Sequence, residues 1–426
     1  MKGPLFVYFM TIIGIGSSLF YPYVAVLVYV LFAVMSPNAL WYYNLPPTFF
    51  NSGFGYSEMV AYPMIIGWVL HSCGNLRIGR AYFPMAILVC YLLWVIVTSF
   101  ILEITPLGWE TVIMLVRLLT AMIIVLTLCN SVFGLKCLVW TIIFGTGFVA
   151  YELNMSYFGG FNRLQMVGFA GMDNNFFAVA MVMGATVSFF TGLAEKNYVL
   201  KALAFLSAVL QAHTVLFSMS RGGMLALCVV GAVSFLLLPK TPGNITLFLV
   251  AVIIGLALAG PSVRERFFSS FENMEDLDGS AQSRLTSWKN CITVIKEKPV
   301  MGVGIQNWAR YARSRFGIFL EAHSTWLQAA AETGIIGGLL QASFIFACMW
   351  KVLAVAFAKI PLPDPSLRYY GQMVIAAMCG YVAAAQFVSL YYLEVVYYVC
   401  LVGLCCLKIS FLYSEELEEE AQVAQA

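Results

Sequence analysis

Residues 82–101 read YFPMAILVCYLLWVIVTSFI, a stretch of twenty residues that contains no charged side chain. A helix of that length is about 30 Å long, which is the thickness of the hydrocarbon core of a bilayer. Similar runs recur along most of the chain. An open sheet in lipid would leave backbone groups unpaired, and barrel strands would show shorter, alternating segments. We therefore predict an all-α fold, a polytopic transmembrane helix bundle.

The composition is typical of a protein that is embedded in a lipid bilayer. The 426 residues are 61% hydrophobic and 10% charged, whereas a soluble domain carries about 25% charged residues. At about 20 residues for each crossing, the length predicts about 12–13 spans joined by short loops. The net charge of +2 comes without a basic tract, so nucleic acid is not an expected partner. The 11 cysteines form no CxxC pair, and we interpret them as packing residues.

The order of apolar and polar segments predicts four parts. Helices of an N-terminal bundle occupy 1–260, a long polar segment follows at 261–322, C-terminal transmembrane helices occupy 323–412, and an acidic tail covers 413–426. Within residues 4–36, Pro22 favours two short helices over one tilted helix. Beyond that run, spans are expected near 57–73, 82–101, 111–130, 134–151, 173–191, 198–218, 221–238, 244–260, 323–350, 369–389 and 391–410.

Basic residues mark one membrane face. Every second short loop carries lysine or arginine, and such loops usually face the cytoplasm. These residues are Arg77, Arg80, Lys136, Lys196, Lys201, Lys240, Lys351, Lys359, Arg368 and Lys408. The long 261–322 segment then lies outside the cytoplasm, and the acidic C-terminal tail lies inside it. The basic residues of the long segment do not oppose this orientation, because long loops cross largely regardless of charge.

The long outer segment contains a predicted amphipathic helix at about 280–298. Leu285, Trp288, Ile292 and Ile295 recur there at helical spacing. Pro299 ends the pattern. We expect this helix either to lie along the membrane surface or to cap the helix bundle.

Three side chains that carry chemistry fall at the same outer face, although they are far apart in sequence. Arg221 and His323 each begin a span, and Arg284 lies on the amphipathic helix. Each alone is typical of structure, because an interfacial arginine usually reaches toward headgroups. Together they favour an anionic ligand, since guanidinium groups match phosphate oxygens and an imidazole exchanges protons near neutral pH. No acidic, histidine or cysteine cluster has metal-ligand spacing, so no metal is expected.

Four motifs carry a resemblance to a known family. SRGGMLAL at 220–227, RLTSW at 284–288, PVMGVGIQNW at 299–308 and AHSTWLQAAAETGIIGGLL at 322–340 resemble, in order, the hallmark segments of the O-antigen ligase / O-antigen polymerase superfamily. MDNNFFA at 172–178 is similar to an earlier asparagine-containing segment of that family. The N-terminal stretch YPYVAVLVYVLFAVMSPNALW resembles the branch of O-glycosylation ligases associated with exosortase systems.

The resemblance implies a metal-independent glycosyltransferase without a cofactor. Such enzymes move a glycan from an undecaprenyl-diphosphate carrier to an acceptor, a lipid A core or a protein hydroxyl, outside the bacterial cytoplasmic (inner) membrane. It implies that Arg221 and Arg284 bind phosphate and that His323 is the essential histidine, so these three form the catalytic set. The residues implied in substrate binding, beside the two arginines, are Gln306, Asn307, Asn175 and Glu332. Glu332 equally fits a buried hydrogen-bonding residue.

Several alternatives stay open at this point. The acceptor could be a second lipid-linked glycan, which would make the protein a polysaccharide polymerase. A transporter or flippase for lipid-linked glycans would instead place its charges near the bilayer midplane. Arg117 lies within an apolar run and should face the bundle interior or reach toward the interface, and it could contact the lipid diphosphate. His323 could be a base or a diphosphate ligand, and a carboxylate base would have to be Asp173 or Glu321.

Overall fold

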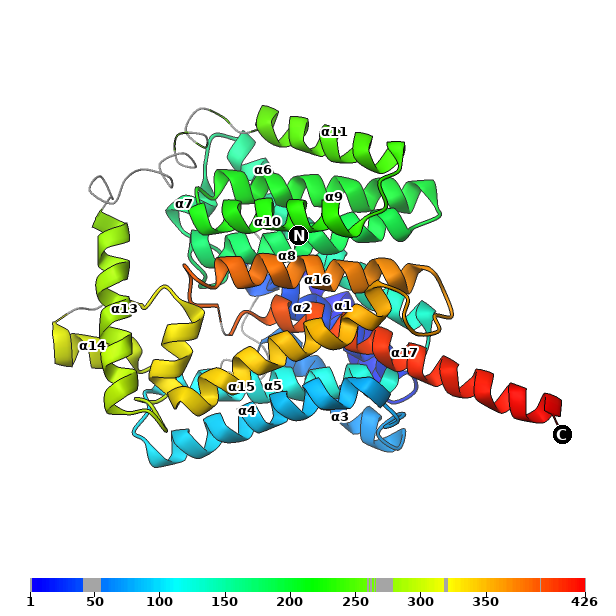
Figure 1. The fold of residues 1–426 in the computed structure, drawn as a ribbon, viewed down its shortest axis with the longest axis horizontal. Coiled ribbons are helices and arrows are strands. Elements are labelled where there is room, and N and C mark those ends of the chain that lie inside the picture. The colour runs from blue at the N-terminus through cyan, green and yellow to red at the C-terminus, as the bar shows by residue number, and fades with distance from the viewer. Residues whose placement is uncertain are drawn as a thin grey trace.

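The computed structural model of the protein describes residues 2–40, 55–258, 279–317, 321–390 and 392–425, together with residues 260, 263 and 265. Within these residues the secondary structure is helical and forms no strand. Most of the long helices run side by side in one bundle (Figure 1). This arrangement confirms the predicted all-α bundle.

The helices follow one another in chain order with short connections. Their bounds are α1 (Lys2–Ser18), α2 (Pro22–Met35), α3 (Tyr56–Leu70), α4 (Tyr82–Ile101), α5 (Pro106–Leu128), α6 (Val132–Phe158), α7 (Arg163–Met166), α8 (Asn174–Ala194), α9 (Tyr198–Phe217), α10 (Arg221–Leu237), α11 (Pro242–Leu258), α13 (Gly279–Glu297), α14 (Trp308–Phe316), α15 (Thr325–Ala356), α16 (Ser366–Ala384) and α17 (Glu394–Gln425). Short 3₁₀ turns lie at Pro37–Ala39 and Gly79–Ala81. The first apolar run forms two helices, and Pro22 is the first residue of the second, where its missing N–H costs no helical hydrogen bond.

Eight helices in the described part of the chain are long and apolar enough to cross a membrane, and α1, α10 and α11 are shorter apolar helices. Two further predicted spans, near 57–73 and 369–389, coincide with α3 and α16, which are in neither set. The polytopic character is therefore confirmed. The division into parts at 260, 322 and 412 stays a prediction, and α17 runs through residue 412 without a break.

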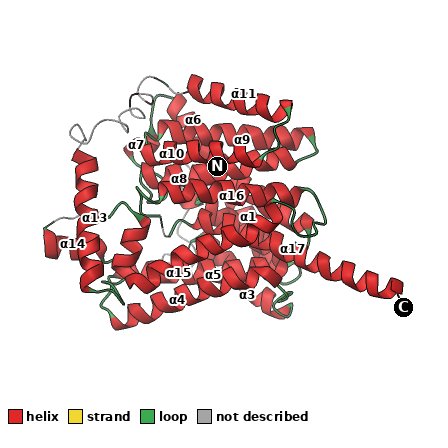
Figure 2. Ribbon diagram, in the orientation of Figure 1, coloured by secondary structure: helices red, strands yellow, loops and turns green. Residues whose placement is uncertain are grey.

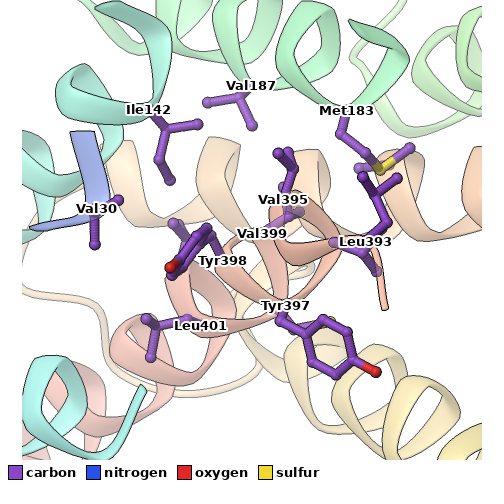
Figure 3. Packing of buried hydrophobic residues seen from close by; sticks show 14 of the residues in the cluster. Val30, Ile142, Met183, Val187, Leu393, Val395, Tyr397, Tyr398, Val399 and Leu401 are labelled. Atoms are coloured by element: carbon purple, nitrogen blue, oxygen red, sulfur yellow. The ribbon is translucent and has the colours of Figure 1, made fainter. Parts of the chain in front are cut away.

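Helix α17 forms the centre of the bundle. Its apolar part is buried all round, and Figure 3 shows Val395, Tyr398 and Val399 against side chains of α2, α6 and α8. Val30 and Ile142 are among these partners. A helix that is hydrophobic on every face needs neighbours on every face. The C-terminal turns of α17 extend past the bundle (Figure 1), where residues 416–425 are exposed.

One correction concerns Lys408, which the sequence placed in a basic loop. It lies inside α17, and its residue is fully buried. Its Nζ donates to the backbone oxygens of Asn75 at 2.9 Å, Leu126 at 2.7 Å and Thr127 at 2.9 Å. These last two oxygens belong to the final turn of α5, whose carbonyl groups have no helical partner and attract a cation. Lys408 therefore joins the central helix to the end of α5.

Helix α13 lies across the opposite end of the bundle (Figures 1 and 2). It spans Gly279–Glu297, close to the predicted range. Its buried face contains Ser287, Cys291 and Val294, whereas Ile292 of the predicted apolar stripe is 44% exposed. The buried face is rotated because Cys291 and Val294 join a small core with residues of α14 and α15. Of the two predicted roles, the helix therefore caps the bundle.

Candidate functional site

A break in α15 positions the loop that carries the motif at 299–308. Gly334 has φ 74° and ψ 174°, which interrupts the helix. The loop fills the break: Ile335 N donates to Pro299 O at 2.8 Å, and Gly304 N donates to Glu332 O at 2.8 Å. A Cβ on Gly334 would lie 1.8 Å from Val300 O, so only glycine fits this close approach.

Glu332 holds the same loop through its side chain. It is 1% exposed. Its carboxylate accepts hydrogen bonds from Gln306 N at 2.8 Å, Trp308 N at 3.1 Å and Gln328 Nε2 at 3.2 Å. This geometry matches the hydrogen-bonding alternative for Glu332. The residue positions Gln306, and contact with a substrate is not needed to explain it.

Asn307 also uses its side chain to hold the fold. Its Oδ1 accepts from Thr105 N at 3.2 Å, and its Nδ2 donates to Glu103 O at 2.9 Å and Val303 O at 3.0 Å. The residue is buried. It ties the motif loop to the connection between α4 and α5. Its role in substrate binding stays a prediction.

His323 is held on both sides in an uncommon backbone conformation. Its φ is 50°, a left-handed value that is uncommon for a residue other than glycine. On one side, Ala322 O accepts from Trp288 Nε1 of α13 at 3.0 Å. On the other side, Thr325 N donates to Ala385 O at 2.9 Å, just after α16. The imidazole is half-buried.

Charges from two other segments act on this imidazole. Burial is the main cause that lowers the pKa of His323 from its usual 6.5, and the Arg284 guanidinium lowers it further. The Asp173 carboxylate acts in the opposite direction and raises the pKa. Because the net pKa is below its usual value, the imidazole is neutral at pH 7. The structure thus brings two members of the predicted catalytic set together and adds Asp173.

Two more side chains belong to the same cluster. Glu321 is an exposed residue, yet partial burial of its carboxyl raises the pKa, while a hydrogen bond from Gln328 acts to lower it. Burial raises the pKa of Tyr392 to about 12, with Glu321 adding to the effect, and Gln306 hydrogen-bonds to its side chain. Sequence reasoning missed Tyr392. Its only signal was a polar, aromatic stretch between the last two spans.

Arg221 reaches this end of the bundle from α10. Ser220 caps the helix by accepting from Gly223 N at 3.1 Å. A Cβ on Gly222 would lie 3.5 Å from Val388 Cγ2 and 3.8 Å from a Phe387 atom. The Phe387 ring is in turn 6.4 Å from that of Trp288, one turn after Arg284 on α13. Arg221 is thereby placed beside the connection that also supports His323.

Asn175 is part of a hydrogen-bonded chain at the start of α8. Its Nδ2 donates to Asn174 Oδ1 at 3.3 Å, and Asn174 Nδ2 donates to Ser218 O at 2.8 Å. Asp173 begins the same helix and accepts from Phe176 N at 2.7 Å. These bonds join the start of α8 to the turn before Arg221. Of this segment, Asp173 is the residue whose charge reaches His323.

The fold and the site together define the class of protein. This is a multi-pass α-helical membrane protein with arginine, histidine and carboxylate side chains gathered at one end of its bundle. Among the residues that the structure describes, no three histidine, cysteine or acidic side chains are grouped as metal ligands. The expectation of no metal and no cofactor stays a prediction.

Comparison with known families gives the class a name. Residues 206–342 match the family model described as O-Antigen ligase, and this match supports the resemblance to the O-antigen ligase superfamily. The match contains Arg221, Arg284, Gln306, Asn307, His323 and Glu332, and it excludes Asn175. It does not test the association with exosortase systems. No curated protein matches the chain.

The family and the apolar helices together give the general function. The matched domain supports a membrane enzyme of the O-antigen ligase/polymerase type, and that family implies transfer of glycosyl groups from lipid-linked glycans. Its helices and its family indicate a multi-pass protein of the bacterial inner membrane.

Proposed function

We propose that the protein is a metal-independent transferase that moves a glycan from an undecaprenyl-diphosphate carrier to an acceptor on the outer face of the inner membrane. The acceptor is a lipid A core or a protein hydroxyl. The observation that supports this best is the convergence of His323, Arg284 and Asp173 at one end of the bundle. Two of these residues lie within the matched segment 206–342.

The arginines would act on the leaving group. When the bond between the anomeric carbon and the diphosphate breaks, its electron pair stays on the diphosphate oxygen. Fixed guanidinium groups of Arg221 and Arg284 stabilise that growing negative charge more in the transition state than in the ground state. Arginine also holds phosphate oxygens in a bidentate manner, so the same side chains would orient the donor.

His323 would act as the base. Its lowered pKa keeps the imidazole neutral and able to accept the proton of the acceptor hydroxyl as that oxygen forms its bond to the anomeric carbon. The proton then lies on the imidazole, where Asp173 stabilises the cation. A diphosphate bound by Arg284 would offset the guanidinium charge that lowers the His323 pKa. The imidazole would therefore become a stronger base when the donor is bound.

The test is a reconstituted reaction with full-length protein in lipid vesicles. Lipid-linked glycan extracted from the native host serves as donor, and envelope material from a host lacking the protein serves as acceptor source. With excess EDTA present, we expect glycan on the acceptor and one undecaprenyl diphosphate released for each transfer, measured by mass spectrometry. Transfer abolished by EDTA would contradict the metal-independent mechanism. Glycan that crosses the vesicle membrane with its carrier bond intact would instead identify a flippase.

A further inference from the structure

A recess with several polar side chains in its wall lies within the bundle, apart from the Arg284–His323 cluster. It is a cavity of about 520 Å³ among α2, α3, α5 and the first residue of α17. The polar and aromatic side chains in its wall include Tyr29, Glu58, Tyr62, Arg117 and Glu394. The volume falls within the range of about 300–1,000 Å³ that is usual for ligand pockets.

The cavity contains an ion pair well inside a membrane helix. Arg117 is about 16 Å along α5 from its first residue, at 1.5 Å for each residue. Its Nη1 pairs with Glu58 Oε1. The other carboxylate oxygen of Glu58 accepts from Gly55 N at 3.0 Å and caps α3. Charges at such depth are costly, and they usually mark a ligand or ion site.

The ion pair leaves donors available at the cavity wall. Within the described ranges of the chain, Glu58 is the one hydrogen-bond partner of Arg117, although a guanidinium carries five N–H groups. The Arg117 side chain is 44% exposed, and the cavity is one surface that it faces. Glu58 is therefore the positioning residue, and Arg117 is the one that can bind.

The remaining wall selects the kind of ligand. Glu394 supplies a second carboxyl group, to which the Tyr398 hydroxyl donates at 3.4 Å. The Glu58 carboxylate already pairs with the guanidinium and would repel a diphosphate, because like charges repel. A hydroxyl-rich molecule both donates to carboxylates and accepts from arginine. The rings of Tyr29 and Tyr62 add flat apolar surface.

We propose that this cavity binds a saccharide portion of one of the two glycan-bearing substrates, separately from the diphosphate site. The proposal rests on the proposed function and names a second subsite for it. Two short chain segments connect the sites. Ala170 and Glu394 lie in the cavity wall, whereas Asp173, three residues after Ala170, and Tyr392, two residues before Glu394, belong to the His323 cluster. A glycan held here would therefore lie beside elements that also support the His323 cluster.

The test measures protection of a reporter cysteine in the full chain. Ala61 lines the cavity and is replaced by cysteine, with the exposed Cys90 and Cys228 changed to alanine. The rate of maleimide labelling is measured with three probes: undecaprenyl diphosphate alone, glycan released by mild acid from the host lipid-linked fraction, and glycan released from the finished envelope of a host that lacks the protein. A Ser314→Cys reporter on α14 is the matched control.

We expect one of the two released glycans to slow labelling at Ala61→Cys about tenfold when it is present at ten times its dissociation constant. Protection by the first glycan identifies the donor, and protection by the second identifies the acceptor. The double variant Glu58→Gln with Arg117→Met keeps an oxygen that caps α3 and should abolish the protection. Equal protection by undecaprenyl diphosphate, or no protection by either glycan, would overturn the proposal. Labelling needs no turnover, so this result is independent of whether Arg284 and His323 catalyse transfer.

Discussion

Burial and charged side chains from two other segments act on the protonation of His323. Burial and then Arg284 of α13 lower its pKa, while Asp173 at the start of α8 raises it. The pKa of an imidazole in such surroundings shifts when either neighbour is altered. The pH at which the transfer rate falls on the acid side of the pH–rate profile should therefore depend on both Arg284 and Asp173.

Replacing Asp173 by Asn tests this electrostatic link. Asparagine is an equally good helix cap, so the change removes the charge and keeps the bond to Phe176 N. Because Asp173 raises the His323 pKa, its removal should lower that pKa. The pH below which transfer declines should then move downward, which is measured from transfer rates between pH 5 and 8.

Asp364→Asn is the control for that experiment, because Asp364 pairs with Lys136 at 3.9 Å at the other end of the bundle. Its profile should keep the wild-type position. An upward shift for Asp173→Asn, or no shift at all, would contradict the role of His323 as the base.

Glu332 should contribute mainly to stability. Glu332→Ala removes the acceptor of the N–H groups of Gln306 and Trp308, and an unsatisfied buried group costs about 1–3 kcal/mol. Glu332→Gln keeps one acceptor oxygen and should lose less. The free energy of unfolding in detergent measures both. As a control, Glu297→Ala breaks an exposed pair with Arg315 and should change it by less than about 1 kcal/mol. Equal stability of Glu332→Ala and wild type would refute this assignment.

At the scale of elements, the broken helix α15 joins the motif loop to His323. The loop at 299–304 pairs with the backbone groups that the break at Gly334 exposes. A helix without this break would have no place for the loop. The break is therefore the feature on which the local architecture depends.

Gly334→Ala should prevent folding, because its Cβ would meet Val300 O and its φ is 74°. Gly231→Ala in α10 is the matched control, since nothing lies within 4 Å of that added Cβ. Size-exclusion profiles of the two purified variants measure the difference. A Gly334→Ala protein that elutes like wild type would show that the break tolerates a side chain.

The sequence predicted elements better than contacts. Apolar runs indicated the helices, and a period of 3.6 located α13, because both signals are local. It did not show that Asp173 acts on His323, that Tyr392 joins the cluster or that Asn307 serves the fold. These depend on which segments pack together across more than seventy residues. Lys408 was misplaced for the same reason, since its carbonyl partners lie in α5 and after α3.

For the whole molecule, the bundle has two unlike ends. The Arg284–His323 cluster and α13 lie at one, and the exposed end of α17 lies at the other (Figure 1). Short basic loops belong to the second end, and the positive-inside rule predicts that this end faces the cytoplasm. The cluster would then face outward, where the glycan is transferred.

Cysteine labelling in intact spheroplasts checks this orientation. Ser314→Cys on α14 should react with a membrane-impermeant maleimide from outside. Glu420→Cys, in the exposed part of α17, should react only after the membrane is opened. Both reporters need the exposed native cysteines replaced. The reverse pattern would place the cluster in the cytoplasm and rule out an outer-face reaction.

The most direct measurement of the catalytic site compares four proteins in the native host at matched membrane levels: wild type, His323→Ala, Arg284→Ala and Arg310→Ala. Arg310 is exposed on α14 and serves as the control. Mass spectrometry follows carrier-linked and acceptor-linked glycans. We expect the first two variants to accumulate carrier-linked glycan outside the membrane and to lose one acceptor-linked species, with Arg310→Ala like wild type. Unchanged glycans in both His323→Ala and Arg284→Ala would show that the cluster is structural and would contradict the account.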